Sequence, residues 1–185
     1  MKKIVLSLLI GALLASFTSC TNEGASSEAT SDAVSSTVSE ATSETTSEAT
    51  SITKEEFSAK IKEKVAFDGD MIDYANLEDY PLDMFGIASD AYNQYVYLEV
   101  SDTTNSYESI IVFAGKSDEK ATLIEEKLNA YIDSLKAQFS NYNATIIEMV
   151  NKSVVKKEGT KVYLIISPNM SEVEAVVTEN LPAFN

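Results

Sequence analysis

A low-complexity tract from Thr21 to Ser51 limits how much of this chain can fold into a packed domain. The tract consists mainly of Ser, Thr, Ala and Glu, repeats the tetrapeptide Ser-Glu-Ala-Thr, and has no aromatic residue. A segment of this composition cannot bury enough apolar surface to offset the conformational entropy lost on ordering. We therefore predict a single folded domain over residues 53–185, preceded by a flexible spacer that tethers it. The alternative is that the repeats are themselves a ligand.

The first 19 residues have the pattern of a bacterial lipoprotein signal peptide. Lys2 and Lys3 precede an apolar run from Ile4 to Ala15, which is shorter than the roughly 20 residues needed to span a bilayer. The run ends in Ser-Phe-Thr-Ser-Cys, which resembles a lipobox, although Phe17 stands where Leu is usual. The alternative is a secretory signal followed by an incidental free Cys.

The lipobox predicts where the protein is found. We expect residues 1–19 to be removed, and Cys20 to be diacylated as the first residue of the mature chain. Residues 20–52 then comprise the lipidated Cys and the spacer. Because two or three acyl chains hold a protein firmly to a bilayer, we expect a lipid anchor at the extracytoplasmic face of the cell membrane.

The composition excludes several classes of activity. The chain has no His, no Arg and one Cys, and its 29 acidic residues outnumber its 14 Lys to give a net charge of −15. Without His, neither a Ser-His-Asp nor a Cys-His catalytic set can form, and one Cys allows no internal disulfide. The acidic balance argues against binding to nucleic-acid phosphates. We expect no cofactor, no metal site and no nucleic-acid partner.

Hydrophobic periodicity and capping residues predict the elements of the domain. The sequence predicts helices over residues 53–66, around Pro81 to Gly86, from Ser117 to Phe139, and from Asn169 to Val177. It predicts strands over 95–100 and 109–114, which pair as one hairpin, and a second hairpin over 154–166 turning at Glu158-Gly159. The segment Tyr142–Val150 fits either a helix or a strand. This order predicts an α+β fold with an antiparallel sheet of about four strands and helices on one face.

The order of these motifs resembles a known family. Leu82-Asp83-Met84-Phe85-Gly86-Ile87 precedes the Tyr-rich strand, an Ile-Val-Phe strand and a long charged helix follow, and Val162-Tyr163-Leu164-Ile165-Ile166-Ser167 comes last. This pattern is similar to the domain-of-unknown-function family 4358, found in lipoproteins of low-GC Gram-positive anaerobes, over about Asn76 to Val177. Lys127-Leu128 and Ala144 depart from the Lys-Arg and Pro common in the family. The family has no established activity, so the resemblance implies no catalytic residue.

Tyrosines supply the candidate ligand-binding residues. Seven aromatic residues fall between positions 74 and 107, and strand alternation places Tyr95 and Tyr97 on one face. Tyr is common at interfaces, but it also fills the cores of small domains. We name Tyr95, Tyr97 and Glu108 as candidate ligand-binding residues and leave open whether the rings are exposed or buried.

Three other groups of residues suggest chemistry. Glu99 and Glu108 lie on neighbouring predicted strands, as a carboxylate pair for hydrolysis would require. Ser117 with Lys120, and Ser153 with Lys156, have a Ser-x-x-Lys spacing, but no supporting Lys-Thr-Gly motif exists. The Asp68-Gly69-Asp70-Met71-Ile72-Asp73 loop has three carboxylates, without the ligand register of a calcium loop.

Together these features favour a membrane-anchored, non-catalytic binding or accessory module of the cell envelope. Its partner would be another envelope protein or a small ligand. The alternatives are a small envelope hydrolase that uses carboxylates or a Ser/Lys pair, and a purely structural spacer lipoprotein.

Overall fold

The structure is a computed structural model, and it describes residues 51–185. The predicted signal peptide, Cys20 and the spacer up to residue 50 lie outside the described residues. The elements, in chain order, are α1 (Lys54–Lys64), β1 (Met71–Asp73), α2 (Tyr80–Phe85), β2 (Tyr92–Val100), β3 (Ser109–Gly115), α3 (Asp118–Phe139), α4 (Ala144–Asn151), β4 (Val154–Glu158), β5 (Lys161–Ile166), α5 (Met170–Asn180) and a 3₁₀ turn at Leu181–Ala183.

Local capping residues set the helix boundaries, as predicted. Thr53 caps α1 in a reciprocal capping box with Glu56, and the Ser117 hydroxyl accepts a hydrogen bond from the Lys120 N–H at the start of α3. Helix α2 carries a Pro in its first turn and ends at Gly86, whose φ of 66° is the left-handed conformation that favours glycine. The ambiguous segment after Tyr142 forms a helix, α4, because the Asn143 side chain accepts hydrogen bonds from two backbone N–H groups of its first turn.

The five strands form one antiparallel sheet in the order β1-β2-β3-β5-β4. The α+β class and both predicted hairpins are confirmed, since β2 pairs with β3 and β4 pairs with β5. The expected count of about four strands is one too low because β1 was not predicted. Its three residues, Met71–Asp73, are too few to show an alternating pattern, and they pair with Val100, Glu99 and Leu98 of β2.

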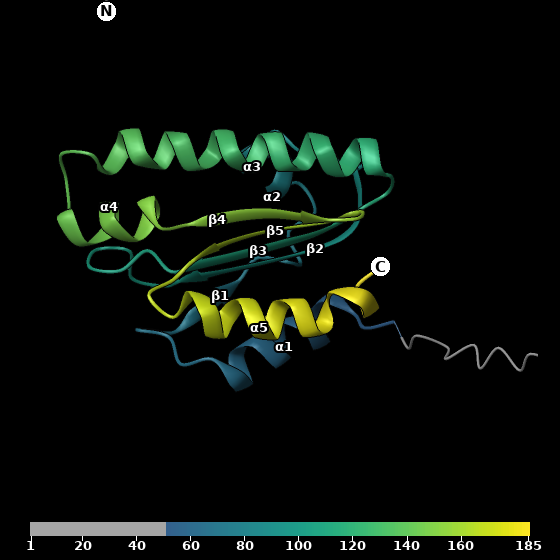
Figure 1. Cartoon of the computed structure of the whole chain (residues 1–185), viewed down its shortest axis with the longest axis horizontal. Helices are drawn as coiled ribbons and strands as arrows, with labels where there is room; N and C mark the ends of the chain where they lie inside the picture. The colour runs from purple at the N-terminus through teal and green to yellow at the C-terminus, as the bar shows by residue number, and fades with distance from the viewer. Residues whose placement is uncertain (1–50) are drawn as a thin grey trace, which may run out of the picture. The chain divides into compact units, whose positions relative to one another are not determined.

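Helices cover both faces of the sheet, which corrects the prediction that they pack on one face. Figure 1 shows α3 and α4 on one side of the sheet and α1 and α5 on the other. Two hydrophobic clusters correspond to these layers: Ile111 and Phe113 of β3 belong to the α3 side, and Ile110 and Val112 to the α1 side. The physical reason was visible in the sequence, because an uninterrupted apolar run is typical of a strand that is buried on both faces.

Candidate functional site

Glu99 lies in a row of side chains that crosses the sheet on its α3 side. In the register of the sheet, Glu99 of β2 is opposite Ile72 of β1 and Ser109 of β3, and Ser109 is opposite Ile166 of β5. Directly opposed residues point to the same face. Ile72 is 41% exposed, Glu99 is partly buried, and Ser109 is fully buried. The row therefore leads from solvent at β1 to the core at β3.

Five tyrosines surround the Glu99 carboxylate. They are Tyr74 and Tyr80 near the start of α2, Tyr97 on β2, Tyr107 just before β3, and Tyr131 on α3, and with Glu99 we call them the Glu99 cluster. The Tyr97 hydroxyl donates a hydrogen bond to Glu99 Oε2. The hydroxyl oxygens of Tyr107 and Tyr131 are 2.8 Å apart and hydrogen-bonded.

Aromatic contacts hold the cluster in place. The Tyr74 and Tyr80 rings are stacked with centroids 4.7 Å apart, and both pack on Tyr97 at 5.1 and 5.6 Å. Phe85, at the end of α2, makes edge contacts with Tyr97 and Tyr131 at 5.6 and 4.9 Å. Offset and edge-to-face arrangements of this kind are the favoured geometries for aromatic pairs.

Burial perturbs the acid–base properties of the cluster. It raises the pKa of Glu99, and the hydroxyls of Tyr97 and Tyr107 partly oppose this shift. Burial, together with the nearby Tyr74 and Glu99, also raises the pKa of Tyr80 to about 12. None of the seven ion pairs among the described residues includes Glu99. Glu99 is therefore a partly buried carboxylate whose hydrogen-bond partners are hydroxyls and not a cation.

A groove reaches the far side of the cluster at Tyr107. It has a volume of about 300 Å³ and is lined by Thr103, Thr104, Tyr107, Gln138, Phe139 and Tyr142. Tyr107 lines this groove, and its hydroxyl is hydrogen-bonded to that of Tyr131. Tyr107 therefore belongs to both the groove and the Glu99 cluster.

The predicted ligand-binding residues Tyr95 and Tyr97 lie in the core on the α3 side, with 4% and 0% of their surface exposed. Tyr97 belongs to the Glu99 cluster. Tyr95 has a positioning role, because its hydroxyl donates to the carbonyls of Tyr74 and Leu77 at 2.7 and 2.6 Å and so fixes the loop that carries Tyr74. In this conformation neither ring presents a face to solvent, and a direct ligand contact by either one stays a prediction.

The third predicted residue, Glu108, is fully buried at a different place. Its Oε1 accepts from the Ser167 hydroxyl at 2.8 Å and its Oε2 from the Asp68 N–H at 2.7 Å. These bonds join the start of β3 to two loops, which is a structural arrangement. Ser109 is paired with Glu99 and points to the same face of the sheet. Glu108 directly precedes Ser109, and successive side chains of a strand point to opposite faces, so Glu108 points away from Glu99. The structure therefore contradicts the proposed Glu99–Glu108 pair.

The two Ser-x-x-Lys motifs also lack a catalytic arrangement. The Lys120 ammonium is bonded to Asp90 Oδ2 at 2.8 Å, and this hydrogen bond raises the pKa of Lys120, which is the wrong direction for a base. Ser117 is occupied as the cap of α3. Lys156 is paired with Glu174 of α5.

The residues of the Asp68–Asp73 loop interact with different parts of the domain. Asp73 lies in β1, where its Oδ2 is 3.6 Å from the ammonium of Lys62 on α1. The Asp68 N–H is bonded to Glu108. Across residues 51–185, no three His, Cys, Asp or Glu side chains converge in a geometry that could hold a metal ion.

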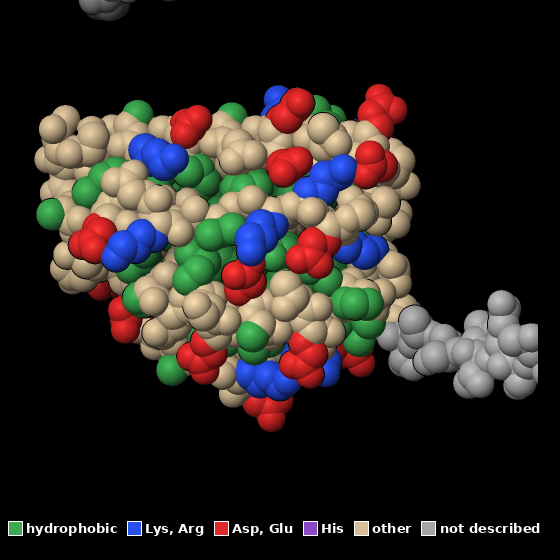
Figure 2. Space-filling view, viewed as in Figure 1, with side chains coloured by type: hydrophobic (Ala, Val, Ile, Leu, Met, Phe, Trp, Pro, Cys, Tyr) green, Lys and Arg blue, Asp and Glu red, His purple; other side chains and the backbone are tan. Residues whose placement is uncertain are grey.

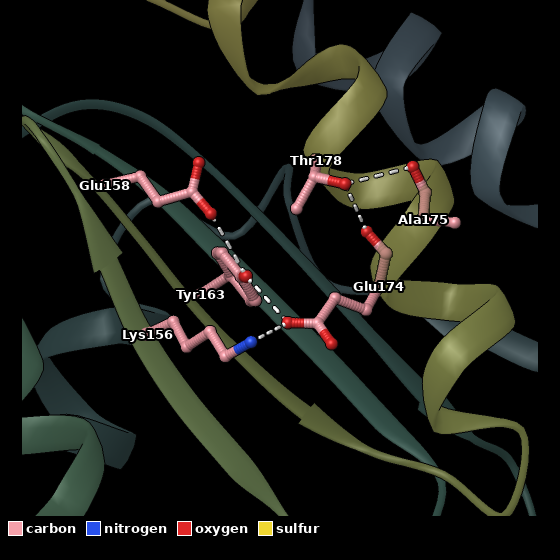
Figure 3. A network of polar contacts seen from close by, with 6 residues as sticks. All are labelled: Lys156, Glu158, Tyr163, Glu174, Ala175 and Thr178. Atoms are coloured by element: carbon pink, nitrogen blue, oxygen red, sulfur yellow. Dashed lines mark hydrogen bonds and ion pairs between the residues drawn. The ribbon is translucent and has the colours of Figure 1, made fainter.

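A second polar network lies on the opposite face of the sheet and contrasts with the Glu99 cluster. Figure 3 shows the Tyr163 hydroxyl between Glu158 and Glu174, at 3.3 and 3.0 Å, with the Lys156 ammonium on Glu174. This lysine holds the pKa of Glu174 below its usual value. Lys156 pairs with Glu174, while Glu158 is bonded to the Tyr163 hydroxyl, and together these contacts join the edge strand β4 to α5.

The surface carries no large patch of one charge on the side that faces the viewer. Figure 2 shows lysines interspersed with acidic residues and with apolar side chains on this face. None of the helices within residues 51–185 has both the length and the hydrophobicity of a membrane-spanning segment.

Sequence reasoning missed Tyr131, Tyr80 and Ser109 as neighbours of Glu99. Tyr131 was placed in the apolar stripe of α3, which is correct, but its distance of 32 positions from Glu99 gave no sign of proximity. The available signal was the alternation of β2, because Glu99 shares its face with Tyr95 and Tyr97, and a carboxylate on a buried aromatic face needs partners.

The comparisons with known proteins agree with the resemblance drawn from the motifs. The sequence model of a family described as Domain of unknown function (DUF4358) matches residues 71–167, more than half of the chain and all members of the Glu99 cluster. The match begins at β1 and ends just after β5, so it includes the whole sheet and leaves out α1 and α5. No curated protein and no solved structure matches this chain. This protein belongs to the DUF4358 family.

Proposed function

We propose that this protein is a lipid-anchored, extracytoplasmic lipoprotein of the cell envelope and that its domain is a non-catalytic binding module. The N-terminal charge, the apolar run and the position of Cys20 support the anchor. The acidic, low-complexity composition of residues 21–51 supports a spacer between the anchor and the domain.

The Glu99 cluster is the observation that carries the binding role. It combines a partly buried carboxylate that pairs with none of the described lysines, close aromatic packing, and an exposed neighbour, Ile72. A perturbed titratable group beside specific polar partners in an apolar setting is a candidate for a functional site. The cluster also lies wholly within the segment that defines the family.

Replacing Cys20 by Ser tests the anchor. In cells fed a palmitate analogue, we expect the native chain to take up the label and to sediment with the membranes. The Cys20→Ser chain should take up no label, because the thioether that carries the lipid cannot form, and it should leave the membrane fraction. Equal labelling of the two chains would contradict the lipid anchor.

Site-specific photo-crosslinking on intact cells tests the binding role. A photoreactive residue at Ile72, beside Glu99, should capture a discrete partner or ligand on the outer face of the cell. The same residue at Glu63, exposed on α1, is the control, and it should not capture that species. Identical capture from the two positions, or none from Ile72, would count against binding at the Glu99 cluster.

A further inference from the structure

We propose that the Glu99 cluster binds the primary ammonium group of a ligand, an inference that rests on the proposed binding function. The ligand class is an amine that is protonated at neutral pH, such as a lysine side chain, an amino sugar or an alkylamine. The inference follows from the charge, the hydrogen-bonding groups and the access of the site.

One cation would balance the charge of the ionised Glu99 carboxylate. A buried or partly buried carboxylate is normally paired, because leaving it without a partner costs desolvation energy that only an opposite charge or strong hydrogen bonds offset. Every described lysine that forms an ion pair does so with a carboxylate other than Glu99. Burial raises the pKa of Glu99, as expected for a carboxylate that has hydroxyl partners but no cation beside it. A ligand with a single positive charge would provide it.

The polar groups around Glu99 are oxygen atoms that can accept hydrogen bonds. Among the described residues, the Tyr74 and Tyr80 hydroxyls form no hydrogen bond that shifts their pKa. The Ser109 hydroxyl, directly across the sheet from Glu99, is fully buried and has no hydrogen-bond partner within the described part of the chain. Buried hydroxyls are usually hydrogen-bonded, so the Ser109 hydroxyl has an acceptor and a donor available for a bound group.

These acceptors fit an ammonium better than the other cations. A primary ammonium offers three N–H donors, and the carboxylate, the phenol oxygens and the Ser109 hydroxyl can accept them. Calcium takes six to eight oxygen ligands, usually with several carboxylates, whereas Glu99 is the one carboxylate in the cluster. A quaternary ammonium has no N–H to donate and would leave the Ser109 hydroxyl unpaired.

Glu99 is only partly buried, and its neighbour on the edge strand is exposed to solvent. Ile72, opposite Glu99 on the edge strand β1, is 41% exposed, so an alkyl stem can lie against it while the ammonium reaches the carboxylate. The electron-rich faces of the tyrosines add a favourable interaction with a cation. The acidic balance of the chain also raises the local concentration of cations near its surface.

Tyrosine fluorescence of the full chain can measure this binding directly. The chain has nine Tyr and no Trp, and five of the Tyr belong to the Glu99 cluster. Titration with n-butylammonium chloride should give a saturable change in emission. The neutral analogue n-butanol, and tetramethylammonium chloride at the same ionic strength, should give none.

Three variants assign the binding to Glu99. Glu99→Gln should weaken n-butylammonium binding at least tenfold, because the amide keeps the shape but removes the charge. Glu126→Gln removes a charge from the exposed face of α3 and should bind like the native chain. Ile72→Lys places an ammonium opposite Glu99 at an exposed position, so it should compete with the ligand and abolish binding even if Glu99→Gln does not fold.

The absence of a saturable change, an equal response to n-butanol or tetramethylammonium, or unaltered binding by Ile72→Lys would each overturn the ammonium assignment. These outcomes would leave the lipid anchor and the capture at Ile72 standing, since those are tested on cells without this probe. Failure of the Cys20 and Ile72 experiments would instead remove the proposed function itself.

Discussion

Replacing Phe113 by Ala is expected to lower the free energy of unfolding by about 3–5 kcal/mol, the usual range for removing a buried phenylalanine ring. Phe113 lies in the central strand β3 and is fully buried. Its ring contacts those of Tyr92 and Tyr95 at 5.2 and 5.6 Å and meets Phe85 edge-on at 6.4 Å. These rings are held by the sheet and α2, so the surroundings cannot collapse to fill the cavity.

Urea unfolding followed by far-UV circular dichroism measures this effect. A loss of this size is a large share of the 5–15 kcal/mol that typically stabilises a domain. The matched control is Leu82→Ala on α2, where the side chain is 52% exposed and the loss should stay below about 1 kcal/mol. A Phe113 variant no less stable than the Leu82 variant would show that the α3-side core does not depend on the aromatic contacts described above.

Raising the pH above 10 is expected to unfold the domain, and its buried and partly buried tyrosines should ionise with this transition and not before it. The structure raises the pKa of eight tyrosines above their ordinary value of 10, and the largest cause in each case is burial. The folded state therefore holds these protons more tightly than the unfolded chain does. The stabilisation is fully present below pH 10 and is lost as the pH rises from 10 through the folded-state pKa values.

The expected size of this effect is large. Each strongly shifted group makes the free energy of unfolding fall by about 1.4 kcal/mol per pH unit within its window. Tyr97 and Tyr107 have the largest shifts, and together they give a slope of about 3 kcal/mol per pH unit above pH 10.

Urea unfolding at a series of pH values from 8 to 12, with tyrosinate absorbance recorded in parallel, checks this expectation. Tyr97→Phe removes one of the shifted protons and should reduce the slope by about 1.4 kcal/mol per pH unit. This variant also distinguishes the contribution of the tyrosines to the slope from that of the lysines, whose exposed ion pairs contribute little to stability. If the tyrosines ionised near pH 10 while the circular dichroism stayed native, the burial of the cluster would be wrong.

Local patterns predicted most of the elements correctly. The stripe from Ala121 to Phe139 identified α3, and Ser117 marked its start. Gly159, with a φ of 57°, forms the predicted turn between β4 and β5. These features depend on residues close together in the chain, where helical or strand periodicity and turn chemistry act directly.

Local patterns did not predict elements that form only by pairing with a distant segment of the chain. Strand β1 has only three residues and exists because β2 offers it an edge. The pairing of β3 with β5, across α3, α4 and β4, set the order of strands in the sheet. No short-range pattern specifies such a pairing, since its energy comes from contacts between segments many residues apart.

The sequence by itself determined the acidic charge, the lack of His, and the helices and hairpins of an α+β domain, and it predicts a lipid anchor at Cys20. Only the tertiary structure decided that Glu99 and Glu108 point to opposite faces and that Tyr74, Tyr80, Tyr107 and Tyr131 meet at Glu99. The physical reason is that composition and periodicity are properties of the chain. The environment of a carboxylate, and hence what it can bind, is set by side chains that folding brings from separate elements.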